Sequence, residues 1–271
     1  MSTDEETRVA ANGQDPWFGL RRFTDARIGL GRSGSAMPTR EVLGFTLSHA
    51  EARDAVLTPI DWTEIEADLS KHGINSHRIS SAVQGRAEYL RRPDLGRRLS
   101  DASRRALLDM AAAAPSERPD LLIVAGDGLS SRAIAANFSA MLAALLPHLR
   151  TQGMKLAPIL LANEARVALG DDAGEALGAR CVLMLIGERP GLSSPDSLGA
   201  YLTWSPKVGM KDADRNCISN IRVRGLGYEE AAFKAAWLLR EAFRRQLTGV
   251  NLKDDSNFLL DAGPAAPRIG L

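Results

Sequence analysis

The chain has 271 residues, a formal net charge of +1 at pH 7 and 45% hydrophobic residues. This length allows a sizeable core in one large domain or two, and the balanced charge gives no support for a nucleic-acid or membrane-surface partner. Its two cysteines, Cys181 and Cys217, make neither a disulfide framework nor a zinc ligand set, so a cytoplasmic location is expected. The N-terminus lacks the basic-then-apolar order of a signal peptide, and we expect no membrane span.

The first hundred residues predict a tail followed by helices. Residues 1–16 are polar and predict a disordered tail, and residues 17–100 predict a small, mostly helical N-terminal region. Thr39 is expected to cap a first helix, and Asp61 a second one that ends at Gly73. A short strand is expected between residues 75 and 82.

Two arginine pairs, Arg91-Arg92 and Arg97-Arg98, flank a Pro-Asp-Leu-Gly turn. Runs of like charge are usually solvated faces, and that interpretation stays open. The functional alternative is contact with an acidic partner or with phosphate. Ser100 then predicts the cap of the next helix.

Residues 101–250 alternate between strand and helix patterns, which is typical of a doubly wound α/β domain with a parallel sheet. Beyond residue 250 we expect a C-terminal tail. The predicted strands are 121–125, 155–161, 182–187 and, at an edge, 199–205; the predicted helices are 131–149, 171–177 and 228–247.

The loop after the first of these strands, Gly126-Asp127-Gly128-Leu129-Ser130, partly matches a dinucleotide-binding loop. Ser131 stands where the third glycine belongs, however, and the strand at 155–161 does not end in the ribose-binding acid. We therefore disfavour nicotinamide binding. Asp127 lies at the ligand edge of the sheet, where it either contacts a ligand or caps the helix.

The segment that follows the strand at 182–187 is the most informative one. In open parallel sheets, ligands bind outside the C-terminal ends of the strands, where this loop from Gly187 to Ser197 lies. An ordinary junction with a surface ion pair remains the alternative. The polar residues expected at this edge form a binding site for a sizeable polar ligand, without an evident nucleophile or acid–base pair: Asp127, Glu188, Arg189, Arg215, Asn216 and Cys217.

Four separate motifs resemble the light chain (small subunit) of ethanolamine ammonia-lyase. They are Arg92-Pro93-Asp94-Leu95-Gly96-Arg97-Arg98-Leu99, Asp127-Gly128-Leu129-Ser130, Ile186-Gly187-Glu188-Arg189-Pro190-Gly191-Leu192 with Ser197-Leu198, and Arg215-x-Cys217-Ile218-Ser219-Asn220-Ile221. They occur in the family's order, and the similarity runs from about residue 27 to residue 249.

The resemblance implies a subunit of an adenosylcobalamin-dependent lyase that converts ethanolamine to acetaldehyde and ammonia. In this family the heavy chain carries the substrate site, and the light chain closes over the cobalamin with a Rossmann-like domain. The family's cofactor contacts correspond to Val167, Glu188 and Cys217, with no catalytic residue or metal ligand expected in this chain. We assign both arginine pairs to the interface with the heavy chain. The location implied is the cytoplasm, or a bacterial microcompartment within it.

Two other functions remain to be separated from this one. A self-sufficient nucleotide-dependent α/β enzyme would be active without a partner and would hold no corrinoid. A purely structural scaffold subunit would assemble with its partner but make no cofactor contact.

Overall fold

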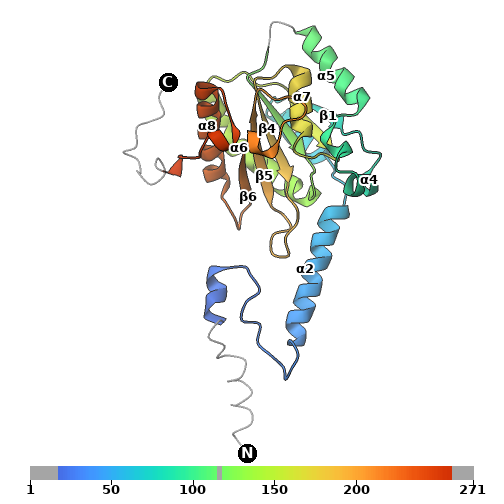
Figure 1. The fold of residues 1–271 in the computed structure, drawn as a ribbon, viewed down its shortest axis with the longest axis vertical. Coiled ribbons are helices and arrows are strands. Elements are labelled where there is room, and N and C mark those ends of the chain that lie inside the picture. The colour runs from blue at the N-terminus through green and yellow to red at the C-terminus, as the bar shows by residue number, and fades with distance from the viewer. Residues whose placement is uncertain (1–17, 115–117, 258–271) are drawn as a thin grey trace, which may run out of the picture.

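A computed structural model describes residues 18–114 and 118–257. One six-stranded sheet forms the centre, in the order β1-β3-β2-β4-β5-β6, with helices on both of its faces (Figure 1). The strands are β1 (Ser76–Ser80), β2 (Leu121–Gly126), β3 (Ile159–Asn163), β4 (Cys181–Gly187), β5 (Leu198–Trp204) and β6 (Arg215–Ile221). The α-helices are α2 (Thr39–Leu57), α3 (Thr63–Lys71), α4 (Arg86–Arg91), α5 (Asp101–Ala113), α6 (Ser131–Thr151), α7 (Leu169–Leu177) and α8 (Tyr228–Arg245). Short 3-10 helices are η1 (Phe18–Phe23), η2 (Leu95–Arg97), η3 (Asp212–Asp214) and η4 (Gly249–Asn251).

Four strands, β1, β3, β2 and β4, are parallel. Every residue of β2 and β4 is buried, because helices cover both faces of this half, and their continuous apolar runs reflect that position. Alternate residues face opposite layers: Ile123 packs with α3, α6 and α8, and its neighbour Val124 packs with α5 and α7.

The predicted all-parallel sheet is wrong for its last two strands. β5 runs antiparallel to β4, and β6 runs antiparallel to β5. The strand expected at 199–205 is therefore not at the edge, since β6 pairs with its outer side. β6 is not among the predicted strands, because Asn216, Cys217, Ser219 and Asn220 interrupt its apolar residues.

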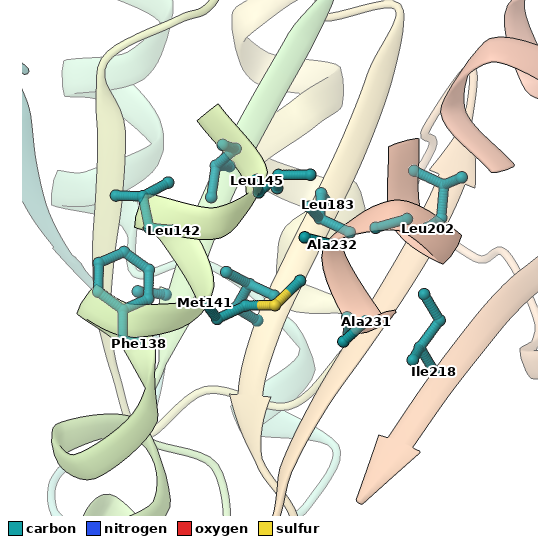
Figure 2. Packing of buried hydrophobic residues seen from close by; sticks show 14 of the residues in the cluster. Phe138, Met141, Leu142, Leu145, Leu183, Leu202, Ile218, Ala231 and Ala232 are labelled. Carbon is teal, nitrogen blue, oxygen red and sulfur yellow. The ribbon is translucent and has the colours of Figure 1, made fainter. Parts of the chain in front are cut away.

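The larger hydrophobic core fills the layer between the sheet and the helices α6 and α8 (Figure 2). Phe138 and Met141 of α6 reach the strands, and the small residues Ala231 and Ala232 let α8 approach β5 and β6 closely. α6 is also the one helix in the described part of the chain that is long and apolar enough to cross a membrane. Its apolar side chains lie in the core, which explains its composition.

The helix caps follow the sequence only in part. Ser100 caps α5 by accepting a hydrogen bond from the Ser103 N–H, as predicted. Thr39 is not a cap but the first helical residue of α2, which Pro38 precedes. Asp61 lies two residues before α3, and its Oδ1 accepts from the N–H of Thr63.

The two ends of the described chain attach to the domain differently. α2 extends away from the sheet (Figure 1), whereas β1, from the predicted N-terminal helical region, is an edge strand of it. Leu252 and Ser256 are buried, so the chain still packs on the domain beyond Val250. Residues 1–16 and most of the expected C-terminal tail lie outside the described residues.

Candidate functional site

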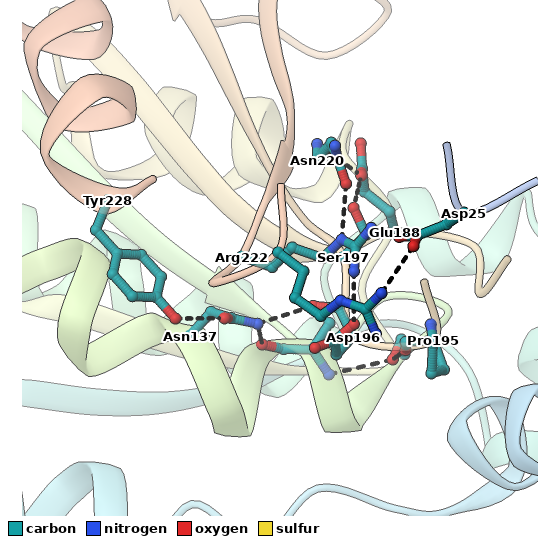
Figure 3. Close-up of polar contacts among 12 residues, drawn as sticks. Asp25, Asn137, Glu188, Pro195, Asp196, Ser197, Asn220, Arg222 and Tyr228 are labelled. Atoms are coloured by element: carbon teal, nitrogen blue, oxygen red, sulfur yellow. Dashed lines mark hydrogen bonds and ion pairs between the residues drawn. The ribbon is translucent and has the colours of Figure 1, made fainter. Parts of the chain in front are cut away.

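Glu188 directly follows β4 and joins three segments of the C-terminal sheet edge (Figure 3). Its carboxylate accepts hydrogen bonds from the hydroxyl groups of Ser197 and Ser219 and, at 3.1 Å, from the backbone N–H of Asn220. A carboxylate has about four acceptor positions. Glu188 therefore holds β4, β5 and β6 together and keeps capacity for one further donor from a ligand.

The loop between Glu188 and Ser197 is fixed against the start of α6. Ser130 donates from its hydroxyl group to the Pro195 carbonyl oxygen at 2.7 Å, and Asn137 donates from Nδ2 to the Asp196 carbonyl oxygen at 2.8 Å. The Tyr228 hydroxyl group in turn donates to Asn137 Oδ1 (Figure 3). Hydrogen bonds to α6 and its cap therefore fix the loop that contains Pro190-Gly191 at the C-terminal edge of the sheet.

A cavity of about 490 Å³ opens at the C-terminal edge of the sheet, lined by the end of β4, the loops after β2 and β3, α4 and β5, and we call it the edge cavity. Val167 and Glu188 both line it, so the structure brings two of the three predicted cofactor contacts together. Its other walls include Tyr89, Arg166 and Tyr201. A cavity of this size takes part of a large ligand and leaves the remainder to be covered by another surface.

Cys217, the third predicted contact, lies on β6 directly opposite Tyr201 of β5. The thiol is therefore next to the edge cavity but is not among its walls. Loss of hydration raises the pKa of Cys217, and the Glu188 charge raises it further, although the hydrogen bond with Tyr201 opposes this. Cys217 is thus a neutral thiol near pH 7, suited to packing rather than nucleophilic attack.

Asp127 does not cap α6, and its side chain is buried. Its buried carboxylate accepts from the backbone N–H groups of Glu164 and Ala165, both at 3.0 Å, and pairs with Arg86 at 3.2 Å. The cap of α6 is Ser130. Burial raises the pKa of Asp127 to about 6, against the opposing effect of Arg86. Asp127 therefore fixes the end of β2 to the loop after β3.

The glycine loop after β2 is explained by backbone packing. Gly128 has φ +57°, and a Cβ atom there would lie 2.1 Å from the carbonyl oxygen of Gly187. That carbonyl oxygen also accepts from the Leu129 N–H at 3.0 Å. The close approach of the β4 end therefore explains the glycine at position 128 without a bound pyrophosphate, and this loop gives no support for the nucleotide-dependent enzyme.

Arg215 is a buried structural residue. Its guanidinium group pairs with Asp171 of α7 and, at 2.9 Å, with the exposed Asp212. It lies beside Thr203 in the strand register. This pair attaches β6 to α7 at one end of the strand, while Cys217 and Ser219 stay exposed further along it.

The two arginine pairs have different surroundings. Arg92 forms a bidentate ion pair with Asp94, at 2.7 and 3.0 Å, and Arg91 donates to the Ala87 carbonyl oxygen of its own helix. Arg97 and Arg98 instead line a second cavity beside the edge cavity. The first pair is thus satisfied locally and the second faces an open space.

Comparison with known proteins identifies the family. The sequence model of the ethanolamine ammonia-lyase light chain matches residues 14–253. The ethanolamine ammonia-lyase small subunit of Rhodopseudomonas palustris (strain BisA53) is 53% identical over 247 residues, covering 91% of this chain and 92% of that protein. The small subunits of Pseudomonas fluorescens (strain Pf0-1) and Ralstonia nicotianae are each 49% identical, covering 93% and 97% of this chain, respectively, and 97% of their own lengths.

The chain belongs to this family. The resemblance found in the four motifs is thereby confirmed, and those motifs can be placed in the ethanolamine ammonia-lyase light chain fold. Gly187–Leu192 forms the held loop at the end of β4, and Arg215–Ile221 is β6. Asp127–Ser130 is the tightly packed turn before α6, and Arg92–Leu99 surrounds η2.

Sequence reasoning missed several walls of this light chain's site. Tyr89 is fully buried, with Arg86 and Arg166 over its ring at 4.6 and 4.3 Å. Tyr201 stands in a strand read only as apolar alternation. Neither tyrosine belongs to one of the four motifs. Tyr201 pairs directly with the exposed Cys217, so a strand prediction for β6 would have placed Tyr201 beside the site.

Proposed function

We propose that this chain is the subunit of an adenosylcobalamin-dependent ethanolamine ammonia-lyase that holds the corrinoid against a large subunit, in the cytoplasm or in a microcompartment there. The observation that carries the proposal is the edge cavity, which brings Val167 and Glu188 together beside the exposed Cys217. The names of the relatives, small subunits of ethanolamine ammonia-lyase, support the reaction and the existence of a larger partner.

The three residues Val167, Glu188 and Cys217 suit the binding of a corrinoid. Its peripheral amide groups are hydrogen-bond donors, and Glu188 keeps one acceptor position after its three internal bonds. Val167 offers apolar contact, and the neutral thiol of Cys217 packs without the cost of burying a charge. The chemistry that adenosylcobalamin supplies when bound is homolysis of its cobalt–carbon bond, which starts hydrogen removal from the substrate.

This chain's own task is binding and orientation. Several walls of the edge cavity are held by hydrogen bonds within the chain, as a preorganised binding surface requires: Tyr89 donates to the Ala165 carbonyl oxygen, Arg166 donates to the Tyr89 carbonyl oxygen, and Glu188 accepts from the Asn220 N–H. In the described residues no group of three or more His, Cys, Asp or Glu side chains is placed to hold a metal ion. We assign the chemistry to the cofactor and the large subunit because the family resemblance places the substrate site on the heavy chain.

The test is to purify the full chain with its large subunit, add adenosylcobalamin, remove the unbound cofactor and record the visible spectrum. We expect corrinoid absorption in the complex, acetaldehyde formation from ethanolamine by the complex, and none by this chain alone. Turnover by the chain alone indicates a self-sufficient enzyme. A complex whose corrinoid binding is unaffected by substitution of both Val167 and Glu188 indicates a scaffold subunit, and both results contradict the proposal.

A further inference from the structure

A second cavity, of about 560 Å³, lies beside the edge cavity and shares Arg166 and Val167 with it. We call it the basic cavity. Five cationic side chains line it, from the η2 segment, the loop after β3, the residue before η3 and the start of β6, against a single carboxylate, that of Asp212. These cations are Arg97, Arg98, Arg166, Lys211 and Arg215.

Most of this positive charge is not neutralised within the chain. Arg215 is paired with Asp171 and Asp212. In the ranges that the structure describes, the other four cations form no ion pair with a carboxylate, and two nearby acids are engaged elsewhere: Asp94 with Arg92 and Asp172 with Arg104. Like charges around one cavity repel each other, so an anion bound there would be favoured by all of them.

Two of the arginines that line the basic cavity also keep one unpaired hydrogen-bond donor each. Arg166 Nε and Arg215 Nε are both buried and have no hydrogen-bond partner among the described residues. Leaving a buried donor unpaired costs roughly 1–3 kcal/mol, so such groups are usually completed by a ligand or a water molecule. The Arg215 side chain is only 2% exposed, and Arg166 is held against the Tyr89 ring at 4.3 Å. The donors are therefore fixed in position before any ligand arrives.

We propose that the basic cavity binds a phosphoryl group. Guanidinium groups bind phosphate oxygens through paired N–H donors, and a phosphoryl group offers several acceptor oxygens to donors that converge from different segments. Its source is either the phosphodiester of the cobalamin nucleotide loop or free phosphate. The first source rests on the proposed function, since it requires the corrinoid in the adjoining edge cavity.

The experiment compares the double variant Arg97→Gln/Arg98→Gln with the control Arg91→Gln/Arg92→Gln, each as the full chain with its large subunit. The control removes the same charge from the preceding arginine pair, and neither Arg91 nor Arg92 lines the cavity. Three probes are titrated by calorimetry: adenosylcobalamin, adenosylcobinamide, which lacks the phosphodiester and the base, and inorganic phosphate. Losing charge-assisted hydrogen bonds of about 1.5–3 kcal/mol weakens binding by roughly 10–100-fold.

A loss of that size for adenosylcobalamin but not for adenosylcobinamide, seen only in the cavity variant, supports the phosphodiester. A loss confined to inorganic phosphate supports free phosphate. Equal affinities of both variants for all three probes overturn the inference, as does failure of only the cavity variant to assemble, which returns Arg97 and Arg98 to the interface. If the unaltered complex binds no corrinoid, the proposed function fails, while the phosphate titration still tests the cavity. Should the double variant not fold, Lys211→Gln is titrated in its place.

Discussion

The two halves of the sheet contribute different things to the site. In the parallel half, all residues of β2 and β4 are buried, and Gly128 and Gly187 bring the backbones at the strand ends into direct contact. In the antiparallel half, β6 exposes three of its seven residues, and Cys217 and Ser219 among them face the site region. The parallel half is thus the framework. The candidate binding surface lies next to β6, where residues of the sheet are exposed.

Each half also has its own buried carboxylate. Asp127 fixes the framework through two backbone N–H groups and the Arg86 side chain. Asp171 fixes the antiparallel half through its ion pair with the Arg215 side chain. The halves should therefore respond differently when a charge is removed. Backbone donors remain in place after any substitution, but the loss of a side-chain partner leaves the opposite charge unpaired.

The largest effect is expected for Arg215→Met, which removes the partner of Asp171 at similar side-chain volume. Asp171 is only 2% exposed, so its charge would be left without a partner. Breaking a buried pair in this way costs about 3–5 kcal/mol. Urea unfolding of the full chain measures the loss.

Two further variants separate the buried pair from the rest of the Arg215 contacts. Adding Asp171→Leu to Arg215→Met should restore much of the stability, because both charges are then gone. Asp212→Asn should change stability little, since Asp212 is fully exposed. If Asp212→Asn destabilises the chain as much as Arg215→Met, the buried pair is not what holds β6.

For the framework, the pH dependence of stability should reveal Asp127. Its folded pKa of about 6 lies above the ordinary 3.8, so its contribution to stability is complete below pH 4 and is lost as the pH rises through 6. The difference between the folded and unfolded pKa of Asp127 corresponds to about 3 kcal/mol of unfolding free energy. In urea unfolding between pH 4 and 7, the wild-type chain should lose stability relative to Asp127→Asn by up to that amount. Parallel curves contradict the assignment.

The framework could be predicted from the sequence, and the binding surface only in part. Continuous apolar runs indicate β2 and β4 because a strand covered on both faces needs no polar residues. β6 carries polar residues that bind Glu188, the η4 region and a neighbouring helix, so its pattern follows these contacts rather than a simple alternation. Because the polar residues of this strand have hydrogen-bond and ion-pair partners in distant segments, the strand cannot be predicted from hydrophobic periodicity.

The candidate site shows the same division. The motif residues Glu188 and Val167 reach one cavity as expected, because both follow parallel strands that end at the same sheet edge. Asp127 and Arg215, which sequence reasoning also placed at this edge, have structural partners instead. Their residue types could not distinguish these roles, since a buried ion pair and a ligand contact use the same groups.

Glu188→Gln tests the residue that links the parallel half to the antiparallel half. The amide keeps one acceptor oxygen but cannot accept from all three internal donors and a ligand as well. We expect cobalamin affinity of the assembled complex to fall by about one to two orders of magnitude, or roughly 1.5–3 kcal/mol. Ser219→Ala removes one internal donor and leaves the carboxylate intact, so it should weaken binding less. Equal losses in both variants would show that Glu188 acts only by positioning β6.

The last prediction is that isotopic labelling of this chain's histidines leaves the cobalt spectrum unchanged. The four histidines lie away from the edge cavity: His49 on α2, His72 after α3, His77 on β1 and His148 on α6. None stands in the Asp-x-His-x-x-Gly context by which some cobalamin enzymes replace the benzimidazole ligand of cobalt. Imidazole is a good ligand for such metals, and we expect no histidine ligand because no histidine lines the edge cavity. With nitrogen-15 in the histidines of this chain, the electron paramagnetic resonance of the cobalt(II) state should keep its nitrogen splitting. A changed splitting would place a histidine of this chain on the metal and would require the segment that carries it to move to the edge cavity when the complex forms.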